Sequence, residues 1–163
     1  MKNTPFYILA QELLAKQQDF SKQLLALLRQ EYKTLSTHNA ENLELITIEK
    51  QPLIVEIDRL NQEWLSVLQA QSVELNTKSI SAYLREYDLN NNTDIHKSWQ
   101  ELQTLAKDCK KSNTVNGTII ALRQQSAQQT LAILRGQLPG DNIYNPQGNN
   151  EAGYASGTAI AKA

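Results

Sequence analysis

The residues that could carry out chemistry are few and scattered along this chain. His38 and His96 are the only histidines, and Cys109 is the only cysteine. A di-iron helical bundle needs repeated Glu-x-x-His pairs, and neither histidine has a glutamate three residues before it. The sequence also lacks a phosphate-binding glycine loop, a nucleophile elbow and a Cys-x-x-Cys pair. We therefore expect no catalytic residues, no metal ligands and no cofactor.

The single reactive or stacking side chains have simpler structural explanations. Cys109 lies on the apolar stripe of a predicted helix, where a free cysteine commonly acts as a small core residue. Trp64 and Trp99 also lie on apolar stripes, so we expect them in the core or in an interface and not as stacking platforms for bases. His96 is expected in a first helical turn, exposed to water.

Composition and charge exclude several classes of function. The lysines and arginines are scattered and the formal net charge is −1, whereas nucleic-acid binding needs a basic stripe. No apolar run approaches the roughly 20 residues that span a bilayer, and the segment from Pro5 to Ala10 is too short for a secretory signal. A single cysteine cannot form an internal disulfide. We therefore expect a cytoplasmic protein without nucleic-acid binding or stable membrane insertion.

Apolar residues spaced three and four apart predict helices over most of the chain. The first helix begins near Thr4-Pro5 and fades over residues 36–41, where Asn39, or alternatively Thr37, is the expected N-cap of the next helix. That second helix carries an uninterrupted three-four seam over residues 43–67. Pro52 lies inside the seam and predicts a kink, because proline removes a backbone donor and clashes with the preceding turn.

A short third helix is expected over residues 76–89, and the asparagine run at 90–92 is expected to form a loop. Thr93 or Asp94 then caps a last helix that extends to Leu134 and stops at Gly136. A helix of about 40 residues is about 60 Å long.

Together these elements predict an all-α protein, an elongated antiparallel bundle of three long helices and one short helix. Residues 1–116 contain no glycine, whereas five of the six glycines lie at or after Gly136. We expect a helical bundle over residues 1–136 and a flexible C-terminal tail over residues 137–163, which is too polar and glycine-rich to pack by itself.

Two asparagines interrupt the apolar stripe of the last helix. Asn113 and Asn116 stand where apolar residues are expected, and Gly117 follows them. One interpretation is a buried polar pair that fixes helix register. The other is a surface that faces a partner, because glycine in a helix lets another backbone approach. The sequence favours neither over the other.

These residues and their order resemble the FlgN family. The resemblance rests on Asn113-x-x-Asn116-Gly117, on the glutamine-rich helix from Ile120 to Leu134, and on Tyr144-x-x-x-Gly148. In the first half it rests on Leu28-x-x-Glu31-x-x-x-Leu35 followed by a polar break and a second seam. The resemblance covers almost the whole chain apart from residues 76–92.

The resemblance implies a non-catalytic chaperone of flagellar type III export, which binds the C-terminal helical ends of the hook-associated proteins FlgK and FlgL. It implies that the last helix binds these clients and that the tail, through Tyr144 and Gly148, docks to the export gate component FlhA. The expected client-binding residues are Asn113, Asn116, Gly117, Ile119, Ile120, Leu122, Arg123, Ala127, Leu131 and Leu134. A structural or adaptor coiled-coil bundle unrelated to secretion is the alternative that composition and periodicity leave open.

Overall fold

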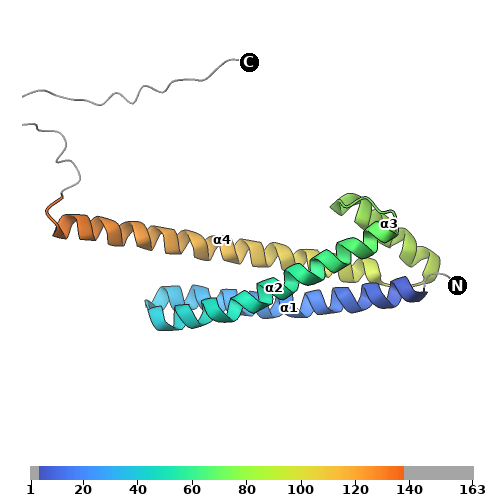
Figure 1. The fold of residues 1–163 in the computed structure, drawn as a ribbon, viewed down its shortest axis with the longest axis horizontal. Coiled ribbons are helices and arrows are strands. Elements are labelled where there is room, and N and C mark those ends of the chain that lie inside the picture. Colours follow the sequence, from blue (N-terminus) through green and yellow to red (C-terminus); the bar gives the residue numbers. More distant parts are fainter. Residues whose placement is uncertain (1–3, 138–163) are drawn as a thin grey trace, which may run out of the picture. The chain divides into compact units, whose positions relative to one another are not determined.

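In the computed structural model the described part of the chain, residues 4–137, is all-α, as predicted (Figure 1). The helices are α1 (Thr4–Thr37), α2 (Ala40–Ala70), α3 (Thr77–Asn91) and α4 (Ile95–Leu134). The chain divides into two compact units, residues 1–120 and residues 121–163, so the second unit begins within α4. No helix within residues 4–137 combines the length and the apolarity that crossing a membrane requires.

A tight turn joins α1 to α2. His38 has a φ of 58° and therefore lies in the left-handed region. The Asn39 side chain accepts a hydrogen bond from the backbone N–H of Asn42 at 3.1 Å, which satisfies one of the free donors at the start of α2. Asn39 is thus the cap, as predicted, and Thr37 instead ends α1. The helix continues through Pro52, whose side chain is exposed.

The asparagine run completes α3 instead of forming a separate loop. Asn90 and Asn91 are helical, and only Asn92 leaves the helix, with a φ of 53°. Asparagine tolerates this left-handed conformation better than most residues.

The side chain that caps α4 is that of Asp88, whereas the sequence predicts Thr93 or Asp94. It accepts hydrogen bonds from the backbone N–H groups of Ile95 at 3.0 Å and of His96 at 2.8 Å. The hydroxyl group of Thr93 also donates to it, at 2.5 Å. The last turn of α3 therefore positions the first turn of α4, which a sequence rule for local caps does not anticipate.

The core of residues 1–120 lies where all four helices contribute side chains. Trp64 is fully buried, and its ring centroid is 5.8 Å from that of Trp99. The ring of Phe6 packs edge-on against Tyr83 and Tyr87, a favoured aromatic geometry. The tryptophans are therefore packing residues, as expected. The buried core residues are Phe6, Ala10, Leu13, Leu14, Leu60, Trp64, Leu68, Ile80, Leu84, Tyr87, Ile95 and Leu102.

Hydrogen bonds between distant residues establish the helix directions. Gln17 on α1 donates to the carbonyl of Leu60 on α2, and Glu31 on α1 pairs with Lys50 on α2. Residue numbers fall along α2 as they rise along α1, so these two helices are antiparallel.

The first half of α4 lies beside α1 and runs parallel to it. Gln18 donates to the carbonyl of Ser98 at 2.8 Å, and Asn116 donates to the carbonyl of Leu28, also at 2.8 Å. Between residues 95 and 120, α4 is therefore antiparallel to α2, in line with the predicted up-and-down order of the long helices.

The end of α4 follows the sequence prediction closely. Gly136 has a φ of 75°, and the N–H of Gln137 donates to the carbonyl of Ala132 at 2.9 Å. A left-handed glycine together with a hydrogen bond back to a carbonyl in the last turn is a common C-terminal cap of helices.

Candidate functional site

A buried polar cluster joins α1, α2 and α4. The side chain of Glu31 is 3% exposed, and one of its oxygens accepts a hydrogen bond from Lys50 Nζ at 2.6 Å. Its other oxygen accepts from Asn116 Nδ2 at 2.7 Å, and the same nitrogen donates to the carbonyl of Leu28 at 2.8 Å. One carboxylate therefore holds a cation from α2 and an amide from α4.

The structure places Asn113 and Asn116, which the sequence analysis treats as a pair, in different environments. Asn116 is 2% exposed, whereas Asn113 is exposed. The donors of the Asn116 amide are directed to α1, while its Oδ1 atom is buried without a hydrogen-bond partner among the described residues. Its geometry supports the interpretation that Asn116 fixes register, since a buried polar group is stabilised only where its partners are in place.

The sequence does not predict the other members of the cluster as a site. Lys50 lies on the predicted α2 seam and Glu31 on the predicted α1 stripe, positions that usually hold apolar residues. A lysine and a glutamate at such positions on two helices are a signal for a buried ion pair, because a buried charge needs a partner.

A hollow of about 570 Å³ lies beside this cluster, between α1 and α4. Its lining combines apolar side chains with three basic ones and a single acidic one, Asp108. The lining residues are Leu25, Leu28, Arg29, Tyr32, Lys33, Asp108, Lys111, Ser112, Val115 and Asn116.

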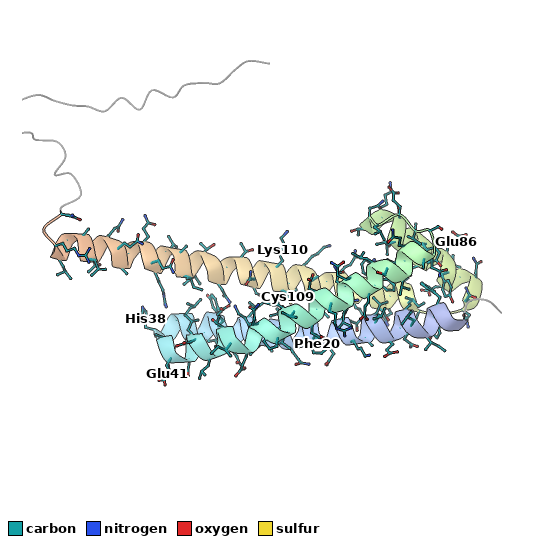
Figure 2. All side chains as sticks on the ribbon, viewed as in Figure 1. Phe20, His38, Glu41, Glu86, Cys109 and Lys110 are labelled. Atoms are coloured by element: carbon teal, nitrogen blue, oxygen red, sulfur yellow. The ribbon has the colours of Figure 1, made fainter. Side chains whose placement is uncertain are left out.

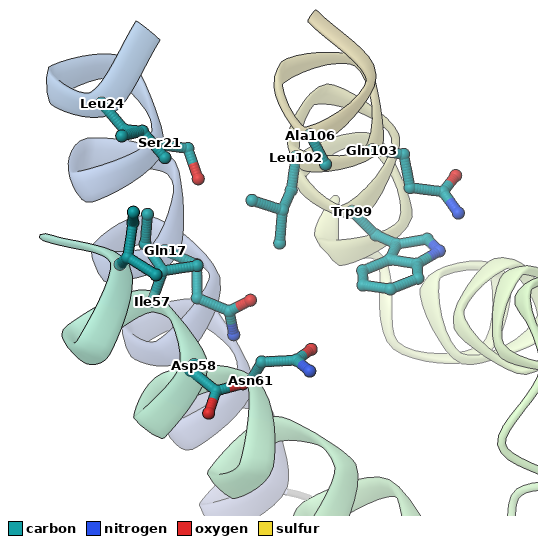
Figure 3. A pocket seen from close by; sticks show the side chains of 11 residues that line it. Gln17, Ser21, Leu24, Ile57, Asp58, Asn61, Trp99, Leu102, Gln103 and Ala106 are labelled. Carbon is teal, nitrogen blue, oxygen red and sulfur yellow. The ribbon is translucent and has the colours of Figure 1, made fainter. Parts of the chain in front are cut away.

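A second hollow, of about 380 Å³, lies among α1, α2 and the first half of α4 (Figure 3). Apolar side chains such as Leu24, Ile57 and Trp99 dominate it, and Asp58 is the one charged residue in its lining. It therefore has no pair of titratable groups that could exchange a proton.

The end of α4 presents an apolar face in two adjacent rows. Ile119, Leu122 and Ile133 lie on one row, and Ile120, Leu131 and Leu134 lie on the other, because residues three, four, seven and eleven apart share a helix face. The exposed fractions of Leu122, Leu131 and Leu134 are 60%, 50% and 77%, and that of Ile133 is 52%. Ile119 and Ile120 are half-buried. We call these six residues the α4 face.

The surroundings of the α4 face are almost uncharged. Arg123, half-buried, is the only charged residue between Gly117 and Leu134. Ala127 is exposed between the two ends of the second row. The client-binding residues expected from the sequence do not include Ile133, although its position eleven residues after Leu122 places it on the first row.

Gly117 precedes the α4 face and is exposed. A Cβ atom added there would meet no atom within 4 Å. Within residues 4–137, then, no backbone occupies the space beside Gly117. Tyr144 and Gly148, the expected gate-docking residues, lie outside the described residues.

Cys109 is half-buried and lies outside the buried core, whereas the sequence predicts a small core residue at this position. Its thiol faces α1 and donates to the carbonyl of Ser21 at 3.4 Å (Figure 2). Burial raises the pKa of this thiol, and the nearby Asp108 raises it further, against an opposing effect of Arg29. A thiol with a raised pKa is a poor nucleophile at neutral pH.

His96 differs from the sequence expectation of an exposed side chain. It is half-buried, and its Nε2 atom lies 2.8 Å from Ser81 Oγ on α3. The pairing of α3 with α4 buries it. Among the described residues, no group of three or more histidine, cysteine or acidic side chains could hold a metal ion.

Comparison with known proteins gives two matches. The family described as FlgN protein matches residues 10–152, which include most of α1 and all of α2, α3 and α4. A crystal structure of a candidate flagella synthesis protein FlgN from Pseudomonas aeruginosa is similar, with 26% sequence identity and a TM-score of 0.60. The similarity covers 67% of this chain and 84% of that one. No curated protein matches the chain.

Proposed function

The chain belongs to the FlgN family, and from this premise we propose that it is a cytoplasmic flagellar export chaperone. In this proposal it binds the C-terminal helical regions of FlgK and FlgL and delivers them to the export gate component FlhA. Family membership and the similar flagella synthesis protein support a flagellar role. The clients and the gate follow from the resemblance described above.

The observation that carries the proposal is the exposed α4 face. Exposed apolar patches commonly mark partner sites, and an amphipathic client helix needs anchors spaced three, four and seven residues apart. The exposed pair Leu131 and Leu134, three residues apart, provides anchors of this kind on one row, and Leu122 and Ile133 are exposed on the other row. Because Arg123 and Arg135 are the only charged residues between Gly117 and Gly136, a client can leave without breaking an extended set of desolvated ion pairs.

Within the proposed client site, the residues have different roles. The α4 face, together with Arg123 and Ala127, contacts the client directly. Asn113 is exposed and can contribute a hydrogen bond at the near end. Asn116 acts through the buried cluster, by holding the start of this helix segment to α1.

Leu131→Asp tests the client site. We expect it to weaken co-purification with FlgK or FlgL at least about tenfold, since burying a leucine contributes about 1.5–3 kcal/mol. Ala121→Asp, at an exposed position on the opposite face of the same helix, is the matched control and should bind the clients normally. Circular dichroism should show unchanged helical content for both variants.

Two results would contradict the client site. If Leu131→Asp unfolds the protein, Leu131 belongs to a core and the client binds elsewhere. If both aspartate variants bind the clients as the wild type does, the α4 face is not the client site.

A further inference from the structure

The outer face of α2 carries a second apolar row, which no described part of the chain covers. Leu45, Ile48 and Val55 are 54%, 61% and 59% exposed, and Pro52 between them is also exposed. Their spacing of three, four and three places all four on one side of the helix. We call them the α2 row. The seam that faces the core is different and contains Ile46, Leu60 and Trp64.

Acidic side chains border the α2 row. Glu44 lies on one side of it, Glu49 on the other, and Glu41 one turn before Leu45. None of these three carboxylates forms an ion pair with a described residue, although ion pairs occur further along at Glu56 and Glu63. The only cation between residues 40 and 58 is Lys50, and its contact with Glu31 keeps it 13% exposed.

A hollow of about 360 Å³ adjoins the first turn of the α2 row. Leu45 and Glu49 form part of its wall, and the rest comes from the start of α2 and the end of α1. It is lined by Gln30, Lys33, Thr34, Asn42, Leu45, Ile46 and Glu49. A partner side chain can therefore be inserted beside the row, with the acidic rim of α2 on one side.

We propose that the α2 row is a docking surface for a basic amphipathic helix of a partner protein, separate from the client site on α4. The apolar row supplies a seam of three-four spacing, and the unpaired glutamates on both sides select lysine or arginine at the flanking positions of the partner. Nucleic acids and anionic membranes are disfavoured because the same glutamates repel them.

Two occupants from the chain itself fit this surface less well. Residues 138–163 contain two acidic side chains and one lysine, so they offer no basic complement. The α4 face of a second copy has Arg123 within its span and Arg135 just beyond Leu134, twelve residues apart, whereas Glu44 and Glu49 are five residues apart. Neither occupant places one cation opposite Glu44 and another opposite Glu49.

A synthetic helical peptide tests the proposal on the full-length chain. It has leucines at three-four spacing and lysines on both flanks, and its affinity is measured by fluorescence anisotropy at low and at raised salt. We expect saturable binding that weakens with salt. Ile48→Ser/Val55→Ser and Glu44→Lys/Glu49→Lys should each weaken binding at least about tenfold. A peptide with glutamates in place of the lysines should not bind.

Matched controls separate this surface from general acidity and from the client site. Glu86→Lys/Glu101→Lys, which changes two exposed glutamates on α3 and α4, should bind the peptide as the wild type does. Leu131→Asp should also bind it normally, so that failure of the client site and failure of this surface are distinguishable. All these substitutions are at exposed positions, and circular dichroism checks the fold.

Three outcomes would overturn the proposal. If the α2 variants bind the peptide unchanged, or only Leu131→Asp weakens binding, the peptide does not occupy the α2 row. If truncation after Leu138 raises the affinity for the peptide about tenfold, the tail of the chain occupies the α2 row. Concentration-dependent dimerisation that Ile48→Ser/Val55→Ser abolishes would assign it to a second copy.

Discussion

Asn116 connects two helices that are far apart in the sequence through a single amide. It donates to Glu31, which is 85 residues away in the sequence, and Glu31 in turn binds Lys50. Removing one member of such a cluster leaves the others buried without a partner, which costs more than the intact hydrogen bonds contribute. The cluster therefore specifies how α4 aligns with α1, more than it adds to net stability.

Replacing Asn116 should destabilise the fold much more than replacing Asn113 on the same helix. We expect Asn116→Ala to lower the free energy of unfolding by about 1–3 kcal/mol, because Glu31 and the Leu28 carbonyl lose a donor. Asn116→Asp should cost more, since it places a second carboxylate beside Glu31. Urea denaturation measures both.

Asn113→Ala and Asn113→Asp are the matched controls, because Asn113 is exposed on the same helix. They should remain within about 0.5 kcal/mol of the wild type. Equal midpoints for the two aspartate variants would show that the contact between Asn116 and Glu31 is absent in solution.

At the scale of elements, α4 joins two different environments in one helix. Its start is capped by Asp88 from α3, and its first half packs against α1. Its second half presents the α4 face, in a segment with one charged residue. Gly117 lies between these parts, and no described residue comes within 4 Å of a Cβ atom added there.

Gly117→Ala should therefore stabilise the protein. We expect a gain of up to about 1 kcal/mol, because alanine is the better helix former and its Cβ meets open space. Thermal unfolding measures it. Gly117→Leu adds bulk at the same place and should weaken FlgK or FlgL binding if a client helix crosses there. A Leu variant that binds clients as the Ala variant does would remove Gly117 from the client site.

At the scale of the whole molecule, the proposal assigns three tasks to three regions. The α4 face binds clients, the α2 row binds a basic helix, and residues 138–163 dock to the export gate. The last assignment rests on the resemblance and on Tyr144, whose ring and hydroxyl group suit a small transient contact.

Truncation after Leu138 separates gate docking from client binding. We expect the truncated protein, and also Tyr144→Ala, to keep its helical content and to bind clients within a few-fold of the wild type. Both should reduce binding to FlhA and impair motility. Tyr154→Ala, which changes another tyrosine of the same segment, is the control for Tyr144. Loss of client binding by a folded truncation variant would instead assign the tail to the client site.

Local sequence patterns predict the four helices and most of their ends. Apolar spacing, the cap at Asn39 and the stop at Gly136 depend on hydrogen bonds and packing within a few residues, and such signals can be read locally. Spacing alone also predicts the two rows of the α4 face, although the client-binding residues expected from the sequence do not include Ile133.

Which polar residues are buried depends on contacts between helices and cannot be predicted from local patterns. Asn113 and Asn116 look equivalent in the sequence, and the contacts of Asn116 with Glu31 and with the Leu28 carbonyl distinguish them. The cap of α4 by Asp88 and the contact between His96 and Ser81 likewise depend on how α3 packs against α4. The α2 row could be listed from its spacing, but its exposure could not. Burial depends on which helix faces meet, and those faces belong to segments that are distant in the chain.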